Sequence, residues 1–581
     1  MRRAGVWLLV LLALVLPRVL FLDADAAPDL CWGTGIWTDE GFYTHNARNA
    51  VLFGQAELDG FNNRNLSPIL DLLQQGIFRG FGVGLVPVRT LSVVFGLLAL
   101  VFFYDGLRRT LGRRVAVTAT LFLGFEPTYL FYNRLALMES PAVCVACAAF
   151  WAWCIGGVRG RLLAGFLAAS LVAWKSSFLL FAPLPVLAAL ITPRPPIMGE
   201  KFPRYRGLGV YALGAVVALL LYYVLWFRPH EDAIVHMNRH YAMEQARPKS
   251  LTQLLWMIRR GWIGYYNGLM QRLFTRDPAL ALLALAGLFA PLWSRRKRGE
   301  ALRVLYLWTM VGILWISVSK YAPTRYYLVF WPALCGHAAV MLWRLPLLKR
   351  KPLAVAVPVG LLAFHVVQPI FFALHRSGWA VGVGLFVGVV AGVGAWLLAP
   401  RLRARSLRVA LVGLYVLSSA SQIGYYFVTK GYRTQEISRE LTRIAQADGK
   451  PSAMILGDWA PNFVVDTKLH SAPVFQKLAN DDDPVGKLHA DYILTSRDKV
   501  HAAQWRKLAP LAYRSENLVA VFPLYQYTLE LYRIPPRPSL RRISDFVGAK
   551  GVRITPPLVP AEQERDREGA GGVSRERGRG K

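Results

Sequence analysis

Long apolar runs separated by short basic clusters occupy most of the first 430 residues. The first run follows Met1-Arg2-Arg3 and resembles a signal peptide, but the many runs after it favour an uncleaved membrane span. Further runs begin near residues 87, 115, 141, 207, 278, 301, 326, 352, 379 and 409. Residues 162–191 are too long for one span and carry Lys175 in the middle, so we predict two short helices joined there. The pattern predicts thirteen spans in all.

The distribution of basic residues supports this topology. The loops on one side of the predicted membrane carry 24 Lys and Arg residues, whereas the short loops on the other side carry 5. Basic residues gather on the cytoplasmic side of membrane proteins, so the first side is predicted to be cytoplasmic and the second extracytoplasmic. Three aqueous segments then lie on the extracytoplasmic side: residues 23–85, residues 228–277 and the chain from about residue 429 onward.

The last of these segments divides near residue 534. Residues 434–444 have helical spacing. Strands are predicted at residues 453–456, 492–494, 518–522 and 527–532. The sequence therefore predicts a polytopic α-helical membrane protein of about 13 transmembrane helices over residues 1–430, followed by a small C-terminal α/β soluble domain over residues 431–534. Residues 535–581 are rich in Pro, Arg, Glu and Gly, which predicts a disordered basic tail.

Composition agrees with the membrane class and excludes others. Hydrophobic residues make up 54% of the chain and charged residues 18%, and the mean hydropathy is +0.34. These values exclude a disordered chain and argue against a soluble enzyme of this length. A net charge of +33 would suggest nucleic-acid binding in a soluble protein. Here the basic residues lie in the clusters that set membrane topology, so we expect no nucleic-acid partner.

The first outer loop carries two adjacent carboxylates, Asp39 and Glu40, close to the predicted membrane surface. The residues after them, as far as Gly54, suit a helix that lies on the interface. One interpretation is structural: Thr38 or Asp39 caps this helix and Glu40 complements its dipole. The other is that the pair is catalytic. Both can hold, because a capped carboxylate is also a fixed one.

Three cations on the outer side are candidates for an anion-binding site. Arg134 is the one basic residue of its loop, and the alternative is an Arg134–Glu139 ion pair that closes a turn. Lys175 lies at membrane depth, which is costly unless the ammonium is paired or faces water, and snorkelling to the surface is the alternative. Arg325 precedes Tyr326, where the alternative is an aromatic belt with anchoring charges.

The second outer loop places His236 and His240 four residues apart, on one face of a helix. A metal site would need a third ligand, which the spacing does not supply. A wet interfacial helix is therefore favoured, with His236 and Arg239 as candidate substrate contacts. A divalent metal is an option that the ligand spacing does not support, and we predict no other cofactor.

Four stretches carry a resemblance to a known family. Asp39-Glu40 is followed by Tyr43 and by Ala47-Arg48-Asn49; Arg134 to Pro141 reads Arg-Leu-Ala-Leu-Met-Glu-Ser-Pro; Lys175 joins two short helices; and Pro323-Thr324-Arg325-Tyr326 precedes an apolar run. These resemble, in order, the Asp-Glu-x-x-Tyr-x-x-x-Ala-Arg-Asn stretch, the Arg-Leu-x-Leu-Leu-Asp segment, an inter-helix lysine and the Pro-Arg-Tyr turn of the polytopic GT-C glycosyltransferases of family 39 type. That family includes protein O-mannosyltransferases and the aminoarabinose transferase that modifies lipid A.

The resemblance covers about residues 1–430, and it has one departure. Family members often carry a charged residue or His just before a proline late in the first loop. Here that stretch reads Arg64-Asn65-Leu66-Ser67-Pro68, with neither Lys nor Glu next to the proline. The departure bears on the acceptor contacts and on any metal site of the lipid A enzymes' kind.

The resemblance implies a membrane glycosyltransferase of the inner (plasma) membrane. The donor would be a sugar on a polyprenyl phosphate, and the acceptor an extracytoplasmic glycan, lipid or protein. Transfer would be a single displacement with inversion, with Asp39, beside Glu40, as the base. The leaving phosphate would bind Arg134, Lys175 and Arg325. Further candidate donor or acceptor contacts are Tyr43, Arg48, Glu139, His236, Arg239 and Tyr326.

Two other functions fit a polytopic chain. A transporter or flippase of a lipid-linked glycan would also use intramembrane charges, but it should show internal repeats, and none is evident in the sequence. A non-catalytic assembly scaffold would use the C-terminal domain to bind a partner.

Overall fold

The computed structural model describes residues 2–28, 34–191, 204–239, 250–263, 299–318, 323–343, 377–398, 404–475 and 479–536, together with positions 30, 280, 283–284, 356, 359–360 and 363–364. The chain forms two units, Met1–Ile534 and Pro535–Lys581. The predicted tail and most of the predicted runs near residues 278 and 352 lie outside the described residues.

Six helices among the described residues are long and apolar enough to cross a membrane, or seven if the bent pair α5 (Arg113–Phe125) and α6 (Pro127–Asn133) is one span. The six candidate spans are Leu85–Leu111, Gly157–Trp174, Arg206–Asn238, Glu300–Ser317, Thr324–Trp343 and Arg408–Ala447. Four shorter apolar helices add to them, at Trp7–Val19, Glu139–Ile155, Ser176–Leu190 and Gly382–Leu398. The mostly helical membrane class is confirmed, and the count of thirteen spans stays a prediction.

The first set of helices runs from α1 to α9. They are α1 (Arg2–Val19), α2 (Gly35–Leu52), α3 (Pro68–Phe81), α4 (Leu85–Leu111), α7 (Glu139–Ile155), α8 (Gly157–Trp174) and α9 (Leu184–Leu190), with 3₁₀ turns η1 (Asn63–Asn65) and η2 (Ser176–Phe181). α7 packs against both α4 and α8. The chain breaks between α8 and η2 at Lys175, where the sequence predicts the junction of two helices.

The later helices flank this group and lead to the C-terminal domain. They are α10 (Arg204–Tyr222), the π turn η3 (Tyr223–Phe227), η4 (Arg228–His230), α11 (Glu231–Asn238), α13 (Leu251–Ile263), α16 (Glu300–Val318), η6 (Thr324–Phe330), α17 (Trp331–Trp343), α20 (Ser377–Leu398), α21 (Ala404–Thr429) and α22 (Arg433–Ala447). α10 packs along α8, and η6 packs against α7 and α16. The turn that carries Arg325 is thereby placed beside the helix that carries Glu139.

The C-terminal domain is built on one five-stranded sheet. The strands are β1 (Met454–Leu456), β2 (His470–Ala472), β3 (Tyr492–Ser496), β4 (Leu518–Leu524) and β5 (Tyr527–Arg533), in the spatial order β2-β1-β3-β5-β4. β1 pairs in parallel with β2 and β3, whereas β5 is antiparallel to β3 and β4. Short helices α23 (Ala460–Phe463), α24 (Pro484–Lys487) and α25 (Lys499–Leu508) and the turn η7 (Ser515–Asn517) connect them.

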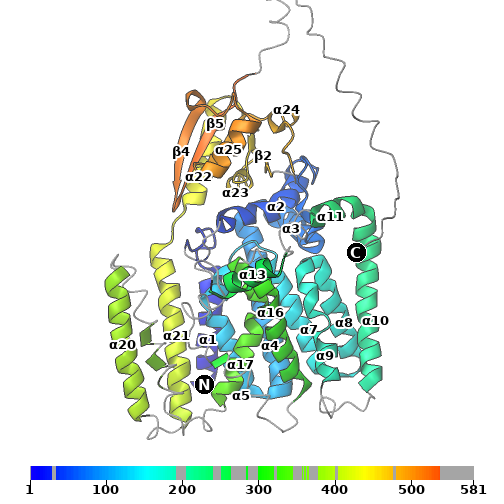
Figure 1. Cartoon of the computed structure of the whole chain (residues 1–581), viewed down its shortest axis with the longest axis vertical. Helices are drawn as coiled ribbons and strands as arrows, with labels where there is room; N and C mark the ends of the chain where they lie inside the picture. Colours follow the sequence, from blue (N-terminus) through cyan, green and yellow to red (C-terminus); the bar gives the residue numbers. More distant parts are fainter. Residues whose placement is uncertain are drawn as a thin grey trace, which may run out of the picture. The chain divides into compact units, whose positions relative to one another are not determined.

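The helix α2 joins the membrane helices to this domain. It packs on α3 and on α23, which lie close to it in Figure 1. One continuous hydrophobic core extends from the membrane helices through Trp37 of α2 to Trp459 and Phe463 in the domain. The helix that carries the two carboxylates is therefore fixed by packing on both α3 and α23.

Candidate active site

The helix α2 places its two carboxylates in different surroundings. It begins at Gly35, and its first residue is preceded by Thr34, whose side chain makes no capping hydrogen bond. The predicted cap at Thr38 or Asp39 is therefore wrong, because the helix starts before both residues. Consecutive helical residues point about 100° apart, so Asp39 and Glu40 meet different partners.

Glu40 is bound on both oxygens by one arginine. Arg89, in the second turn of α4, donates from Nε to Glu40 Oε1 at 2.8 Å and from Nη2 to Oε2 at 2.5 Å. The backbone N–H of Ala136 adds a hydrogen bond to Oε1 at 2.7 Å. Arg89 Nη1 also donates to the carbonyls of Leu22 and Ala24, at 2.8 and 2.7 Å. Glu40 is buried and both of its oxygens accept hydrogen bonds, so its contacts hold α2 and α4 together; a catalytic role for it stays a prediction.

Asp39 lies at one end of a chain of four charges. Its Oδ2 pairs with Nη1 of Arg325, the second residue of η6. Arg325 Nε lies 3.1 Å from Glu139 Oε1, and Lys175 Nζ donates to the same oxygen at 2.5 Å. We call Asp39, Arg325, Glu139 and Lys175 the charge cluster. It comes from α2, η6, α7 and the α8–η2 break, and all four side chains are buried.

Aromatic rings and a glycine shape the cluster. Lys175 Nζ lies 4.3 Å from the ring centroid of Tyr326, and that ring stacks on Trp315. A Cβ added to Gly35 would lie 2.7 Å from Asp39 Oδ2 and 2.9 Å from Arg325 Nη1. A side chain at position 35 would therefore displace the ends of Asp39 and Arg325, and glycine lets the backbone of α2 approach this pair closely.

Burial tunes the protonation of Asp39. Desolvation raises the pKa of its carboxyl from 3.8 to about 6, with the carboxylates of Glu139 and Glu40 acting in the same direction. The cations Arg325 and Lys175 oppose this shift. Tyr43 lies one turn after Asp39, and its phenol feels the charges of Arg325, Asp39 and Glu139. A carboxylate with a pKa near neutrality is suited to accept a proton.

Arg134, one of the three cations predicted for the phosphate site, and Arg48, a predicted substrate contact, both bind backbone carbonyls instead of joining the charge cluster. Arg134 donates to the carbonyls of Pro17, Leu20 and Phe21 at 2.6, 2.8 and 2.7 Å, so it binds the C-terminal end of α1. The alternative ion pair between Arg134 and Glu139 is also absent among the described contacts, because Glu139 pairs with Lys175 and Arg325. Arg48 donates to the carbonyls of Val465, Thr467 and Leu469.

The candidates of the second outer loop are exposed. His236 and Arg239 lie at the surface, on α11 and just after it. His240, the second member of the predicted histidine pair, lies outside the described residues. Across the part of the chain that the structure describes, no group of three or more His, Cys, Asp or Glu side chains is arranged to hold a metal ion.

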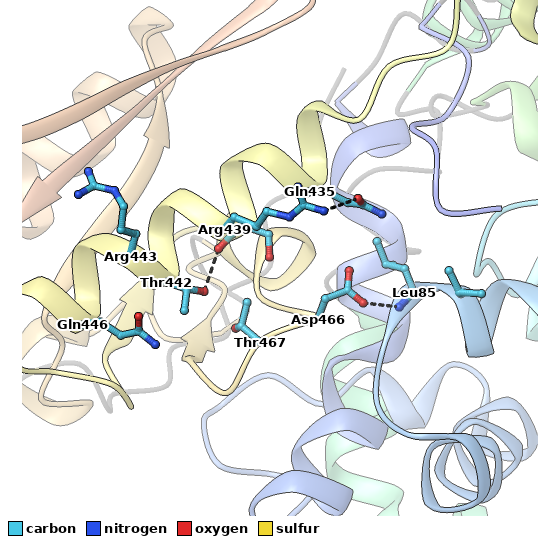
Figure 2. Close-up of a pocket in the computed structure, with 10 residues that line it drawn as sticks. Leu85, Gln435, Arg439, Thr442, Arg443, Gln446, Asp466 and Thr467 are labelled. Carbon is cyan, nitrogen blue, oxygen red and sulfur yellow. Dashed lines mark hydrogen bonds between the residues drawn. The ribbon is translucent and has the colours of Figure 1, made fainter. Parts of the chain in front are cut away.

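Two residues that sequence reasoning did not single out position α2. In the sequence, Arg89 is a charged residue near the start of an apolar run. A charge at such a position is costly unless it is paired, so the sequence could have predicted a buried partner for Arg89. Asn462 of α23 accepts a hydrogen bond from Gly41 N at 3.1 Å, and a Cβ on Gly41 would lie 2.2 Å from Asn462 N. Just after α23 in the chain, Asp466 accepts a hydrogen bond from the backbone N–H of Leu85 at 2.8 Å (Figure 2). No local pattern in the sequence marks these contacts.

The chain is similar to a family of glycosyltransferases in sequence and to solved glycosyltransferase structures in fold. Residues 65–228 match the family model of dolichyl-phosphate-mannose-protein mannosyltransferase. ArnT from Cupriavidus metallidurans has a similar structure both bound to undecaprenyl phosphate (TM-score 0.58, 19% identity) and in the apo state (TM-score 0.57, 18% identity); each match covers 92% of this chain and 100% of that chain. The archaeal oligosaccharyltransferase AglB from Archaeoglobus fulgidus matches at a TM-score of 0.44 and 13% identity, over 86% of this chain and 70% of that chain. No curated protein sequence matches the chain.

These matches confirm the resemblance to the GT-C glycosyltransferases. The family model covers Arg134 to Pro141 and Lys175 but begins after Asp39 and ends before Arg325. The match to ArnT covers 92% of this chain and shows the fold. The roles of the individual side chains rest on the geometry of this protein.

Proposed function

We propose that the protein transfers a sugar from a polyprenyl-phosphate carrier to an extracytoplasmic acceptor at the plasma membrane. The observation that carries the proposal is the charge cluster, which sets a carboxylate of raised pKa beside two cations where α2 meets the membrane helices. The family match and the ArnT fold favour this donor class. A lipid-linked donor keeps its chain in the membrane and brings its phosphate to the interface, where such a cluster can meet it.

In the proposed reaction, Asp39 accepts the proton of an acceptor hydroxyl or amine as that atom attacks the anomeric carbon. The bond between this carbon and the phosphate oxygen breaks, and the phosphate leaves with the electron pair. The single displacement inverts the anomeric centre. Arg325 and Lys175 stabilise the charge that develops on the leaving phosphate. The pairing of Arg325 with Asp39 links the base to the phosphate site.

Unsatisfied polar atoms support a ligand near the cluster. Among the described residues, Glu139 Oε2 and Thr324 Oγ1 are buried without a hydrogen-bond partner. Thr324 directly precedes Arg325, and Glu139 contacts both cations. Buried polar groups without partners are costly. A sugar hydroxyl of a bound donor could donate to Glu139 Oε2, and a phosphate oxygen could accept from Thr324 Oγ1. Tyr43 and Tyr326 line the same region and are candidate sugar contacts.

The direct test is sugar transfer by the purified protein in detergent with defined polyprenyl-phosphate sugars. Transfer with release of polyprenyl phosphate would support the proposal. Movement of the lipid-linked sugar across reconstituted vesicles, without transfer to any acceptor, would instead identify a flippase. Binding of a partner protein with neither activity would identify a scaffold.

The pKa of Asp39 predicts the acid limb of the pH profile. The carboxyl must be ionised to act as a base, and its pKa is about 6 rather than 3.8. Below pH 6, kcat/KM should therefore fall by about tenfold for each pH unit, while above pH 7 this group should no longer limit the rate. The profile is measured with the purified protein, and a fluorescence check at each pH excludes unfolding. A rate that stays level down to pH 4.5 would contradict the assignment.

Lys175→Met should weaken use of the donor. The ammonium is assigned to the leaving phosphate, and a charged hydrogen bond of this kind is worth roughly 1.5–3 kcal/mol, or about one to two decades in kcat/KM for the donor. The remaining ion pair between Glu139 and Arg325, at 3.1 Å, keeps the carboxylate compensated. Lys450→Met in the C-terminal domain, where Lys450 pairs with Asp491, is the matched control. Equal kinetics for both variants would remove Lys175 from the site.

A further inference from the structure

A groove outside the charge cluster lies between the C-terminal domain and the start of a membrane helix. It has a volume of about 440 Å³. One wall is a face of α22, the opposite wall is Asp466 and Thr467, and the floor is Leu85 and Val86 at the start of α4. Figure 2 shows Thr442 and Thr467 on facing walls, with Arg443 directed away from Asp466.

The wall formed by α22 is polar and carries one uncompensated cation. Its lining residues recur at helical spacing: Gln435, Ser438, Arg439, Thr442, Arg443 and Gln446. Arg443 pairs with Glu440 at 2.6 Å. Arg439 forms no ion pair within the described part of the chain, and its guanidinium reaches Gln435 Oε1 at 3.4 Å. Arg439 is thus the guanidinium of the groove that can take an anion.

The opposite wall offers a hydrogen-bond acceptor. Asp466 Oδ1 accepts from Leu85 N at 2.8 Å, which uses one of about four lone-pair positions on the carboxylate. The carboxylate can also accept from a ligand hydroxyl. A ligand that carries both a phosphate and hydroxyl groups would match Arg439 on one wall and Asp466 on the other.

Below the groove, α4 continues as an exposed apolar stripe. α4 is a candidate span of 27 residues. Four exposed apolar side chains, Val86, Val94, Leu98 and Val101, lie on one face of its first 17 residues, with the exposed Thr90 among them bonding back to the carbonyl of Val86. At 1.5 Å per residue this stripe is about 22 Å long, which exceeds the roughly 15 Å of half a bilayer core. It is long enough to lie along an acyl chain.

We propose that this groove binds the headgroup of an anionic membrane lipid that bears free hydroxyls, with the lipid chains lying along the stripe of α4. The phosphate pairs with Arg439, and headgroup hydroxyls bond to Asp466 and to the amides and hydroxyls of α22. Leu85 and Val86 mark the level at which headgroup gives way to chain. The site is separate from the charge cluster and does not depend on sugar transfer.

The test compares two lipids with identical chains on the full-length protein in detergent, by native mass spectrometry. Phosphatidylglycerol has a phosphate and two hydroxyls, whereas phosphatidylcholine has a neutralised phosphate and no hydroxyl. We expect preferential retention of phosphatidylglycerol, and Arg439→Gln should reduce it by about tenfold. Arg439→Lys keeps the charge and should retain most of the binding. Arg506→Gln, at an exposed arginine of α25 outside the groove, should bind as the unmodified protein does.

Three outcomes would overturn the proposal. The first is equal retention of the two lipids, and the second is unchanged binding by Arg439→Gln. The third is displacement of the lipid by soluble glycerol phosphate at the same concentration, because that anion lacks the chains that the stripe should hold. Since no outcome requires turnover, the result is independent of whether the charge cluster transfers a sugar.

Discussion

Asp39→Asn should lower turnover by about 10²–10⁴-fold, because Asn cannot accept the acceptor's proton. The variant should remain folded. Burial raises the pKa of Asp39 to about 6, so the neutral form costs less in the folded protein than it does for an aspartate exposed to water. A neutral amide of the same shape is therefore well tolerated beside Gly35 and Arg325. The measurement is kcat with a defined donor, together with the thermal midpoint in detergent.

The matched control is Asp71→Asn. Asp71 is also buried, and burial also raises the pKa of its carboxyl, but it lies on α3 and pairs with Arg64 at 3.1 Å. Its replacement should leave kcat nearly unchanged. Near-normal turnover by Asp39→Asn would refute the base assignment and leave Asp39 as a structural partner of Arg325. A large loss in both variants would point to a general effect of uncharging buried carboxylates.

Hydropathy and charge predicted the features that depend on local sequence. The break at Lys175 follows from an overlong apolar run with a charge in its middle, and α8 ends there. Short apolar runs in the last aqueous segment predicted β1, β3, β4 and β5. β2 (His470–Ala472) was missed because its sequence, His-Ser-Ala, forms no apolar run, whereas β1 is equally short but consists of Met, Ile and Leu.

The partners of the charged residues could not be predicted in the same way. Sequence reasoning treated Arg134, Lys175 and Arg325 alike, because all three lie in outer loops beside apolar runs. The carbonyls that bind Arg134 are more than 110 positions away in the chain, at the end of α1. Only the packing of α6 against α1 decides that Arg134 binds a helix end rather than an anion.

The different roles of the two adjacent carboxylates also could not be predicted from the sequence. Asp39 and Glu40 are neighbours in a shared motif, and no residue type distinguishes their roles. The helix turns one toward η6 and the other toward α4, and each then meets a different arginine. The family motif marks the two carboxylates as a pair. The structure distinguishes them: the pKa of Asp39 is raised toward neutrality, whereas Glu40 is bound on both oxygens by Arg89.

Arg89→Met should destabilise the protein by about 3–5 kcal/mol. Met keeps most of the apolar stem but leaves Glu40 as a buried carboxylate whose remaining hydrogen-bond donor, among the described residues, is the Ala136 N–H. The carbonyls of Leu22 and Ala24 also lose their shared donor. The effect should appear as a large drop in the thermal midpoint in detergent. Arg79→Met on α3, where the arginine is exposed and bonds Gln75, should change it little.

A double variant separates the charge effect from the loss of packing. Glu40→Gln combined with Arg89→Met removes both charges, so the uncompensated carboxylate that makes Arg89→Met costly is gone. The double variant should therefore recover a substantial part of the lost stability, and the coupling between the two positions should exceed about 1 kcal/mol. Additive losses would show that Arg89 acts through its backbone-carbonyl contacts and not through Glu40. Recovery would establish that the second carboxylate of the motif fastens α2 to α4, and that Asp39 is positioned by a buried ion pair at the adjacent residue.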